Sequence, residues 1–270
     1  MRSILLHIED DDCLDARLQV ALDLARSFRG HIECLQTVPV DIGLPGDLYG
    51  VMATEVLPKL REAADRLRDR IEPRLVGADV AWSWLFEEGL AVETLIERSR
   101  LSDVMVLGSC NGHLVRAPSD LAGETTVRVR TPILLVPPTA RGLDPDRPAL
   151  VAWDGSPQAC RAARAATPLL ARASQVILAT VGDRSDEPPF DLPPAEGAEY
   201  LARHDIPCEI VQLPPKGRSI GQVLAHAAAA RDVAYLVMGA YGRMRVTERI
   251  WGGVTREMFA NPPLPIFACH

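Results

Sequence analysis

The chain has 270 residues, of which 47 % are hydrophobic, and a formal net charge of −7 with a pI of about 5.4. This length accommodates two domains of ordinary size, and the hydrophobic fraction is typical of a globular protein with a full core. The acidic balance argues against nucleic acid as a partner, and no apolar run approaches the ~18 residues of a membrane span.

The first half of the sequence alternates short β-branched runs with amphipathic helical segments, which is typical of a parallel α/β sheet. Pro58 falls inside the second predicted helix and is expected to kink it or delay its start. We expect strands near 3–8, 30–37, 79–86, 103–107 and 132–136, and helices near 14–28, 51–72, 90–100 and 120–128.

The second half has the same alternation. The segment PPTARGLDPDRP (137–148) is rich in Pro, Asp and Arg and reads as a connection, so we place a linker at 139–148 between domains 1–138 and 149–270. After it we expect strands near 149–153, 175–181, 207–213, 234–238 and 264–268, and helices near 157–171, 194–204, 219–230 and 253–260.

The two halves are similar to each other in sequence pattern. SILLHIEDDDCLDARLQVALDLARSF from residue 3 corresponds to ALVAWDGSPQACRAARAATPLLARAS from residue 149. Self-similarity at roughly 145 residues indicates two copies of one domain rather than a solenoid of short units. We therefore predict two open, doubly wound, five-stranded parallel sheets with helices on both faces. Ligands of such sheets bind beyond the carboxyl ends of the strands.

The cysteines at positions 13, 34, 110, 160, 208 and 269 are scattered, with no Cys-x-x-Cys pair. This spacing indicates reduced, mostly buried thiols in a cytoplasmic protein. The opening MRSILLHIEDDD is too short and too soon acidic for a signal peptide. The six histidines are equally dispersed, so the sequence supports no metal cluster.

The stretch YLVMGAYGRMRVTERIWGGV (235–254) is the most informative part of the chain. Gly239 ends a predicted strand, Gly242 follows closely, and Gly252 and Gly253 open a predicted helix. Glycines let a ligand approach the backbone, and amide groups at a helix start favour an anion. The pattern therefore predicts a phosphate cradle, and its alternative is two loop turns and a helix cap.

The turn VAWDGSPQA follows the first strand of the second half. Ser156 before Pro157 is favoured as a helix cap over a nucleophile. Asp154 has two interpretations of equal weight. It either accepts a hydrogen bond from its own turn or accepts one from an amino group or ribose hydroxyl of a ligand.

These residues resemble the universal stress protein family. VAWDGSPQA is similar to its first strand and turn, and MGAYGRMRVTERIWGGV to its G-x2-G-x9-G-[S/T] nucleotide motif. The resemblance covers nearly the whole chain as two tandem copies, and it implies a flavodoxin-like (Rossmann-like) sheet in strand order 3-2-1-4-5 and binding of ATP or AMP, with or without Mg²⁺. The adenine pocket implied by the resemblance contains Asp154 and Val181. The implied ribose and phosphate contacts are Met238, Gly239, Gly242, Gly252, Gly253 and Val254.

The second copy departs from the family motif at one position. The final Ser/Thr of the motif is Gly253, so a hydroxyl contact to phosphate is lost. This loss is expected to weaken binding by ~1.5–3 kcal/mol. Thr255 is placed to compensate, or it packs within the helix.

The first copy departs further. Gly108 and Gly112 are separated by three residues, Gly123 is followed by Glu124, and the turn IEDDD places negative charge where adenine would sit. We expect this copy to be structural or regulatory, or to bind something other than ATP.

No P-loop and no G-x-S-x-G elbow occurs in the sequence, so we expect a binding module rather than an enzyme, with at most slow incidental ATP hydrolysis. One hypothesis is a nucleotide-binding stress-response protein. The other is a nucleotide-independent scaffold that acts through an unknown protein partner. A weaker alternative is a small-metabolite or lipid binder that uses the loops 39–50 and 182–194.

Relatives implied by the resemblance dimerise through their fifth strands. We expect LLVP (134–137) and PIFA (265–268) to pair within one molecule as a pseudo-dimer, and a further homodimer is open. No membrane partner is expected.

Overall fold

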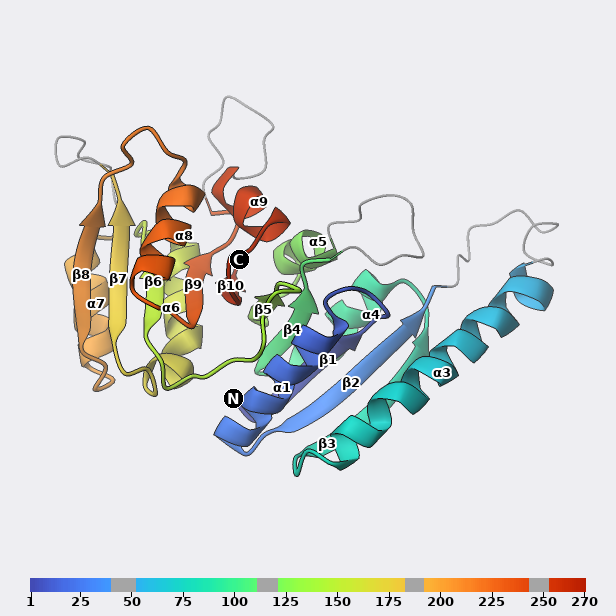
Figure 1. Ribbon diagram of the computed structural model, residues 1–270. Coiled ribbons are helices and arrows are strands. Elements are labelled where there is room, and N and C mark those ends of the chain that lie inside the picture. Colours follow the sequence, from blue (N-terminus) through green and yellow to red (C-terminus); the bar gives the residue numbers. More distant parts are fainter. Residues whose placement is uncertain (40–51, 111–120, 183–191, 243–252) are drawn as a thin grey trace.

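The computed structural model describes residues 1–39, 52–110, 121–182, 192–242 and 253–270. In them, ten strands form one sheet in the order β3-β2-β1-β4-β5-β10-β9-β6-β7-β8 (Figure 1). The strands are β1 (Ser3–Ile8), β2 (His31–Val38), β3 (Ala81–Glu88), β4 (Val104–Gly108), β5 (Ile133–Val136), β6 (Ala149–Ala152), β7 (Val176–Val181), β8 (Cys208–Leu213), β9 (Tyr235–Gly239) and β10 (Ile266–Cys269).

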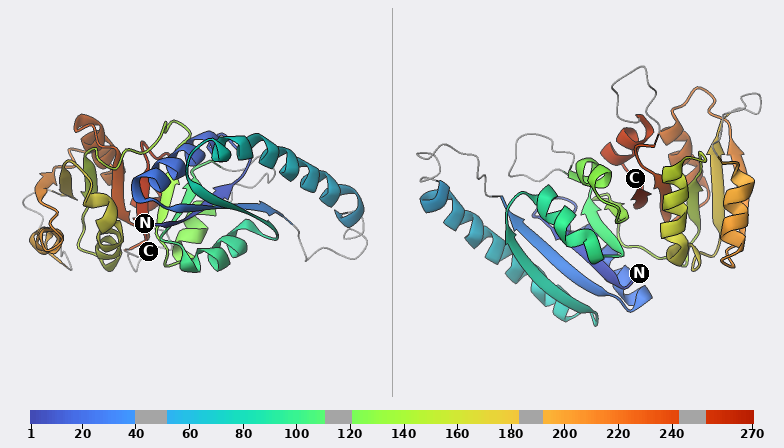
Figure 2. Two further views of the ribbon diagram at one scale, coloured as in Figure 1. Left: turned by 90° about the horizontal axis from the view of Figure 1, so that it is seen from below. Right: turned by 180° about the vertical axis from the view of Figure 1, so that it is seen from behind.

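Helices cover both faces of the sheet (Figure 2). One core lies under α1 (Leu14–Phe28), α3 (Leu57–Val76), α6 (Pro157–Leu170) and α7 (Pro194–Ala202). The other lies under α4 (Ala91–Arg98), α5 (Leu121–Arg128), α8 (Ile220–Ala230) and α9 (Gly253–Ala260). A short π-helix, Met52–Val56, precedes α3. A short 3-10 helix, Ser99–Leu101, follows α4. The α/β class with helices on both faces is therefore confirmed.

The prediction of two separate sheets is wrong. Each half has the strand order expected for it, β3-β2-β1-β4-β5 and β8-β7-β6-β9-β10, but β5 and β10 pair antiparallel and join the halves. Leu134 lies opposite Phe267, and both are fully buried. An unpaired fifth strand would expose backbone donors and acceptors and apolar side chains. The pairing that the sequence predicted for 134–137 and 265–268 removes both edges at once.

Helix α3 begins where its proline allows. The helix starts at Leu57, so Pro58 lies in the first turn, where its missing N–H leaves no bond unmade. The π-helix Met52–Val56 runs directly into α3, so helical backbone begins near the predicted start at 51 and becomes α-helical just before the proline.

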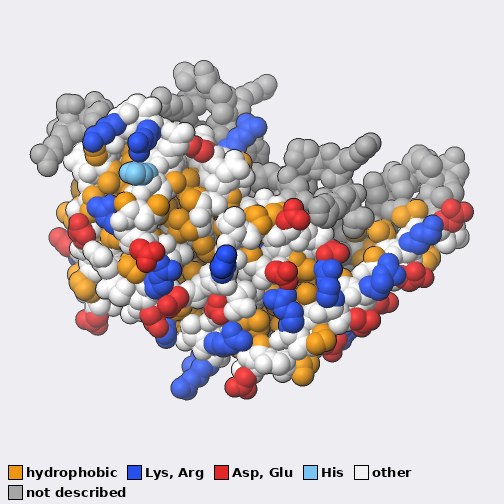
Figure 3. All heavy atoms as spheres, in the orientation of Figure 1, with side chains coloured by type: hydrophobic (Ala, Val, Ile, Leu, Met, Phe, Trp, Pro, Cys, Tyr) orange, Lys and Arg blue, Asp and Glu red, His pale blue; other side chains and the backbone are white. Residues whose placement is uncertain are grey.

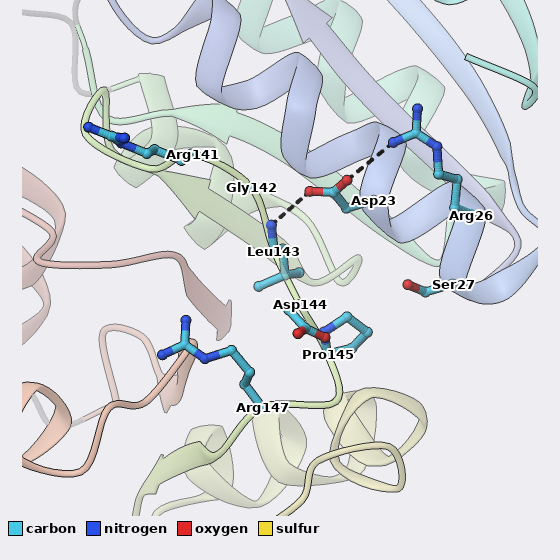
Figure 4. A pocket seen from close by; sticks show the side chains of 9 residues that line it. All are labelled: Asp23, Arg26, Ser27, Arg141, Gly142, Leu143, Asp144, Pro145 and Arg147. Carbon is cyan, nitrogen blue, oxygen red and sulfur yellow. Dashed lines mark hydrogen bonds and ion pairs between the residues drawn. The ribbon is translucent and has the colours of Figure 1, made fainter.

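The linker is held against α1. Leu143 is buried, and its N–H donates to Oδ2 of Asp23 at 2.9 Å (Figure 4). A Cβ at Gly142 would lie 2.5 Å from the same carboxylate oxygen, so the chain passes too close to Asp23 for a larger residue. The other oxygen of Asp23 pairs with Arg26 at 3.3 Å. The predicted linker thus docks on the first half through specific contacts.

Charged side chains of both signs are interspersed over α3 rather than gathered in one patch (Figure 3). Arg68 pairs with Glu72 and Arg66 with Glu62 along the helix surface. Among the residues that the structure describes, no helix combines the length and the apolar character needed to span a bilayer.

Candidate functional site

The carboxyl ends of β6, β7 and β9 form one edge of the second half. Ala152 pairs with Met238 on one side and with Ala179 on the other, so the three strands end together. This register brings Asp154, Val181 and Gly239 to the same edge, as the sequence predicted. Asp154 is exposed there, Val181 and Gly239 are half-buried, and Met238 is buried.

The turn after β6 has a fixed shape. Gly155 has φ +71°, and a Cβ there would lie 2.3 Å from the carbonyl oxygen of Leu192. The Trp153 indole N–H donates to that same oxygen at 3.1 Å. Only glycine combines this left-handed backbone with so close a neighbour.

Asp154 and Ser156 both bond to backbone groups within this turn. Oδ1 of Asp154 accepts from the N–H of Ser156 at 3.0 Å, and the Ser156 hydroxyl accepts from the N–H of Ala159 at 3.1 Å. Ser156 is 2 % exposed and caps α6, as predicted, so it is not presented as a nucleophile. The turn interpretation of Asp154 is thus present in the structure, and its exposed carboxylate remains at the strand end.

The motif glycines Gly239, at the end of β9, and Gly242, just after it, both pack closely against α6. A Cβ at Gly239 would lie 2.5 Å from the amide nitrogen of Ala159 and 2.7 Å from the carbonyl carbon of Gln158. A Cβ at Gly242 would lie 3.0 Å from Oε1 of Gln158. The sequence predicted glycine for close approach of a ligand, whereas the close neighbour of both residues is the first turn of α6.

The start of α9, unlike Gly239 and Gly242, is not closely packed. Gly253 is exposed, and a Cβ there would meet no atom within 4 Å. Val254 is half-buried against the core of that face. Thr255 is buried, and its hydroxyl accepts from the N–H of Tyr241 at 3.0 Å. The Thr255 hydroxyl therefore holds the backbone of Tyr241 rather than replacing the missing hydroxyl of the motif.

Three predicted features lie outside the described residues. They are Gly252 of the second motif, Gly112 of the first, and most of the two loops 39–50 and 182–194.

The first half repeats the acidic turn with the same bond. Oδ1 of Asp11 accepts from the N–H of Cys13 at 2.8 Å, and α1 begins directly after Cys13 as α6 begins after Ser156. Asp11 is therefore the counterpart of Asp154. Its side chain, however, is 1 % exposed and lies 2.6 Å from Nη1 of Arg17.

Arg17 fills the strand edge of the first half. Its Nη2 donates to the carbonyl oxygen of Glu9 at 2.8 Å. A Cβ at Gly108, the end of β4, would lie 2.2 Å from Nη1 of Arg17. The counterpart of Arg17, four residues after the cap, is Cys160 in the second half. The sequence predicted negative charge at this turn, and at Asp11 that charge is neutralised by Arg17.

The buried position of Arg17 could have been predicted from the sequence. It lies on the apolar face of α1, beside Leu14, Leu18 and Ala21, all of which are buried. An arginine at a core-facing position of an amphipathic helix indicates a buried acidic partner.

Cys13 and Cys110 form a disulfide, with Cα atoms 5.9 Å apart across a sequence separation of 97 residues. The prediction of reduced thiols is wrong for this pair. The two residues meet because β1 and β4 are adjacent parallel strands, with Leu6 opposite Val106. Four cysteines form no disulfide, namely the buried Cys34 and Cys269 and the half-buried Cys160 and Cys208.

Two cavities formed by described residues lie away from the carboxyl edge of β6, β7 and β9. One of about 520 Å³ lies between α1 and the linker, where Asp23 pairs with Arg26 (Figure 4). The other, of about 720 Å³, lies between α5 and α6 beside the β5–β10 pair and is lined by Arg130, Arg161 and Arg164. Neither contains a residue that the sequence predicted for the site.

No protein-family model matches the sequence, and no curated protein matches it. Among solved structures, the chain is similar to a universal stress protein from Archaeoglobus fulgidus DSM 4304, with 17 % identity and a TM-score of 0.71 over 99 % of this chain and 96 % of the other. It is also similar to a candidate universal stress protein from Pseudomonas aeruginosa UCBPP-PA14, with 15 % identity and a TM-score of 0.57 over 100 % and 93 % of the two chains. The chain therefore has the universal stress protein fold over its whole length, as the resemblance implied.

Proposed function

We propose that this chain is a tandem universal stress protein of the stress response that binds one adenine nucleotide, ATP or AMP, with or without Mg²⁺. The site is the carboxyl edge of the second half, and the first half has a structural or regulatory role. The contrast between Asp154 and Asp11 carries the proposal. The same turn presents an exposed carboxylate in one copy and a buried, ion-paired carboxylate in the other.

Asp154 is suited to recognise the base or the ribose. Its Oδ1 is oriented by the N–H of Ser156, and the turn that carries it is fixed by Gly155 and by the bond from Trp153. An acceptor that is already oriented loses little entropy when an amino or hydroxyl group docks on it. The half-buried Val181, which ends the neighbouring strand β7, supplies apolar surface for the base.

The start of α9 is suited to the phosphates. Gly253 adds no side chain between the helix amides and a ligand, and the helix N-terminus carries partial positive charge. The hydroxyl of the family motif is absent, and Thr255 is engaged by Tyr241. We therefore expect binding weaker by tenfold or more than in a site that retains the hydroxyl.

The second candidate function is a nucleotide-independent scaffold that acts through protein–protein contacts. It is favoured by one observation. Gly239 is required for packing against the backbone of α6 and Gly242 lies close to the Gln158 side chain, so the glycine spacing has a structural cause without a nucleotide. Under either candidate the protein is a binding module, and we assign no catalytic residue.

Calorimetric titration of Mg-ATP and of AMP into the purified chain tests the proposal. We expect binding of one nucleotide per chain and its loss in Asp154→Ala. Glu209→Ala is the matched control, because Glu209 is an exposed carboxylate at the opposite end of the same sheet, near the start of β8. Absence of binding in the wild type would leave the scaffold as the better description, and equal affinity in the Asp154 and Glu209 variants would show that the nucleotide does not bind through Asp154.

A further inference from the structure

We propose that Cys13 and Cys110 form a reversible redox site that exchanges with low-molecular-weight thiols and disulfides of the glutathione class. This inference concerns the first half and does not depend on nucleotide binding by the second. It starts from the disulfide that joins the residue before α1 to the segment after β4.

The two sulfur atoms differ in access. Cys13 is 0 % exposed, whereas Cys110 is half-buried. An incoming thiolate therefore reaches Sγ of Cys110 first. It forms a new S–S bond there, and the bond to Cys13 breaks, so that Cys13 leaves with the electron pair as a thiolate and then takes up a proton.

A second thiol completes the reduction. Its thiolate attacks the outer sulfur of the mixed disulfide on Cys110, which releases the low-molecular-weight disulfide and leaves Cys110 as a thiol. The sum is one protein disulfide and two small thiols converted to two protein thiols and one small disulfide. Oxidation is the reverse, with Cys110 as the residue that is modified and Cys13 as the residue that resolves it.

The surroundings of Cys13 favour it as a leaving group. It directly precedes the first turn of α1, where a helix stabilises negative charge. The N–H of Cys110 donates to its Sγ at 3.2 Å. Nη1 of Arg17 and Cβ of Cys13 both lie within 3 Å of the point that a Cβ at Gly108 would occupy, so the guanidinium, which is paired with Asp11, is adjacent to Cys13. A thiolate stabilised in this way leaves faster in thiol–disulfide exchange.

Three of the other four cysteines, Cys34, Cys208 and Cys269, have raised pKa values. Burial raises the pKa of Cys34 and of Cys269 to about 12, and it raises the pKa of Cys208 as well. These thiols therefore carry little of the thiolate that exchange requires. These three thiols are thus expected not to exchange.

The second half has no equivalent pair. The positions that correspond to Cys13 and Cys110 are Ser156, which caps α6, and Tyr241, two residues after Gly239. The bridge therefore crosses, in the first half only, the strand edge that carries the candidate nucleotide site in the second half. Redox sensitivity is confined to the copy whose acidic turn is already filled by Arg17.

The experiment equilibrates the full-length protein in buffers of varied reduced and oxidised glutathione, traps free thiols by alkylation and quantifies the Cys13 and Cys110 peptides by mass spectrometry. We expect the bridge to open as the ratio of reduced to oxidised glutathione is raised, at millimolar total glutathione, and to close again as that ratio is lowered. Cys34 and Cys269 should stay unmodified throughout. A bridge that persists throughout in the native protein would identify a structural staple. A pair that stays reduced in oxidised glutathione would also overturn the proposal.

Two variants test the roles of the two sulfurs. Cys13→Ser should accumulate glutathione on Cys110, because the resolving thiol is gone. Cys110→Ser should leave Cys13 unmodified, because Cys13 is buried. Cys208→Ser serves as the matched control and should behave as the wild type. Modification of Cys13 in the second variant, or none of Cys110 in the first, would contradict the assigned order, and the wild-type titration remains decisive if a variant folds poorly.

Discussion

Replacing Arg17 should destabilise the protein more than any surface change. Its guanidinium bonds Oδ2 of Asp11 at 2.6 Å and the carbonyl oxygen of Glu9 at 2.8 Å, and the side chains of Arg17 and Asp11 are each 1 % exposed. Arg17→Met keeps most of the apolar stem but leaves the buried carboxylate without its cationic partner. Removing one member of a buried ion pair costs about 3–5 kcal/mol, and we expect a loss of that size in the free energy of unfolding.

A double variant separates charge from packing. Asp11→Asn keeps an oxygen for the N–H of Cys13, which Asp11 bonds at 2.8 Å, and removes the charge. Combined with Arg17→Met, it should recover most of the loss, because no buried charge is left unpaired. Urea unfolding followed by circular dichroism, with the disulfide intact in every sample, measures both effects. An Arg17→Met variant within about 1 kcal/mol of the wild type would refute the reasoning, since surface changes cost no more than that.

Gly239→Ala should lower the free energy of unfolding by about 1–3 kcal/mol through overpacking against the backbone of Ala159, whereas Gly253→Ala should be neutral or slightly stabilising. Thermal melts compare the two, and equal midpoints would show that the strand end is not closely packed. Ser156→Ala should cost about 1 kcal/mol by loss of the α6 cap, measured by denaturant unfolding; no change would place the cap elsewhere. Burial, with the charge of Arg17, lowers the pKa of His7 from 6.5 to about 3. Between these values the unfolded chain binds a proton that the folded chain does not, so stability should fall as pH drops from 6.5 toward 3, by up to about 1.4 kcal/mol per pH unit. His7→Gln should show a shallower slope over this range in pH-dependent unfolding, and an unchanged slope would contradict the assignment.

Local patterns predicted most of the fold. The limits of α1 and α9 match their predicted ranges, because apolar periodicity defines both helices. The internal repeat predicted two copies of one domain, and the strand order of each half was implied by the resemblance to the universal stress protein family. The joining of the halves into one sheet was expected only as a contact between LLVP and PIFA. Its consequence for the sheet depends on the antiparallel register of Leu134 and Phe267, which no local pattern encodes.

The candidate site was predicted less completely. The register of β6, β7 and β9 confirms that Asp154 and Gly239 share one edge. The cause of the glycine spacing was missed, because the first turn of α6 meets Gly239 across 80 residues of sequence. The disulfide was missed for the same reason, since Cys13 and Cys110 are 97 residues apart and have no motif spacing.

We propose that only the second half binds nucleotide, because Arg17 fills the corresponding strand edge of the first half. Cys160 is the counterpart of Arg17, so Cys160→Arg copies the first half's arginine into the second without altering Asp154. Calorimetric titration of Mg-ATP into the wild type and into this variant is the most direct measurement. We expect one site per chain in the wild type and none in a folded Cys160→Arg variant. Two sites per chain, or undiminished binding in the variant, would contradict it.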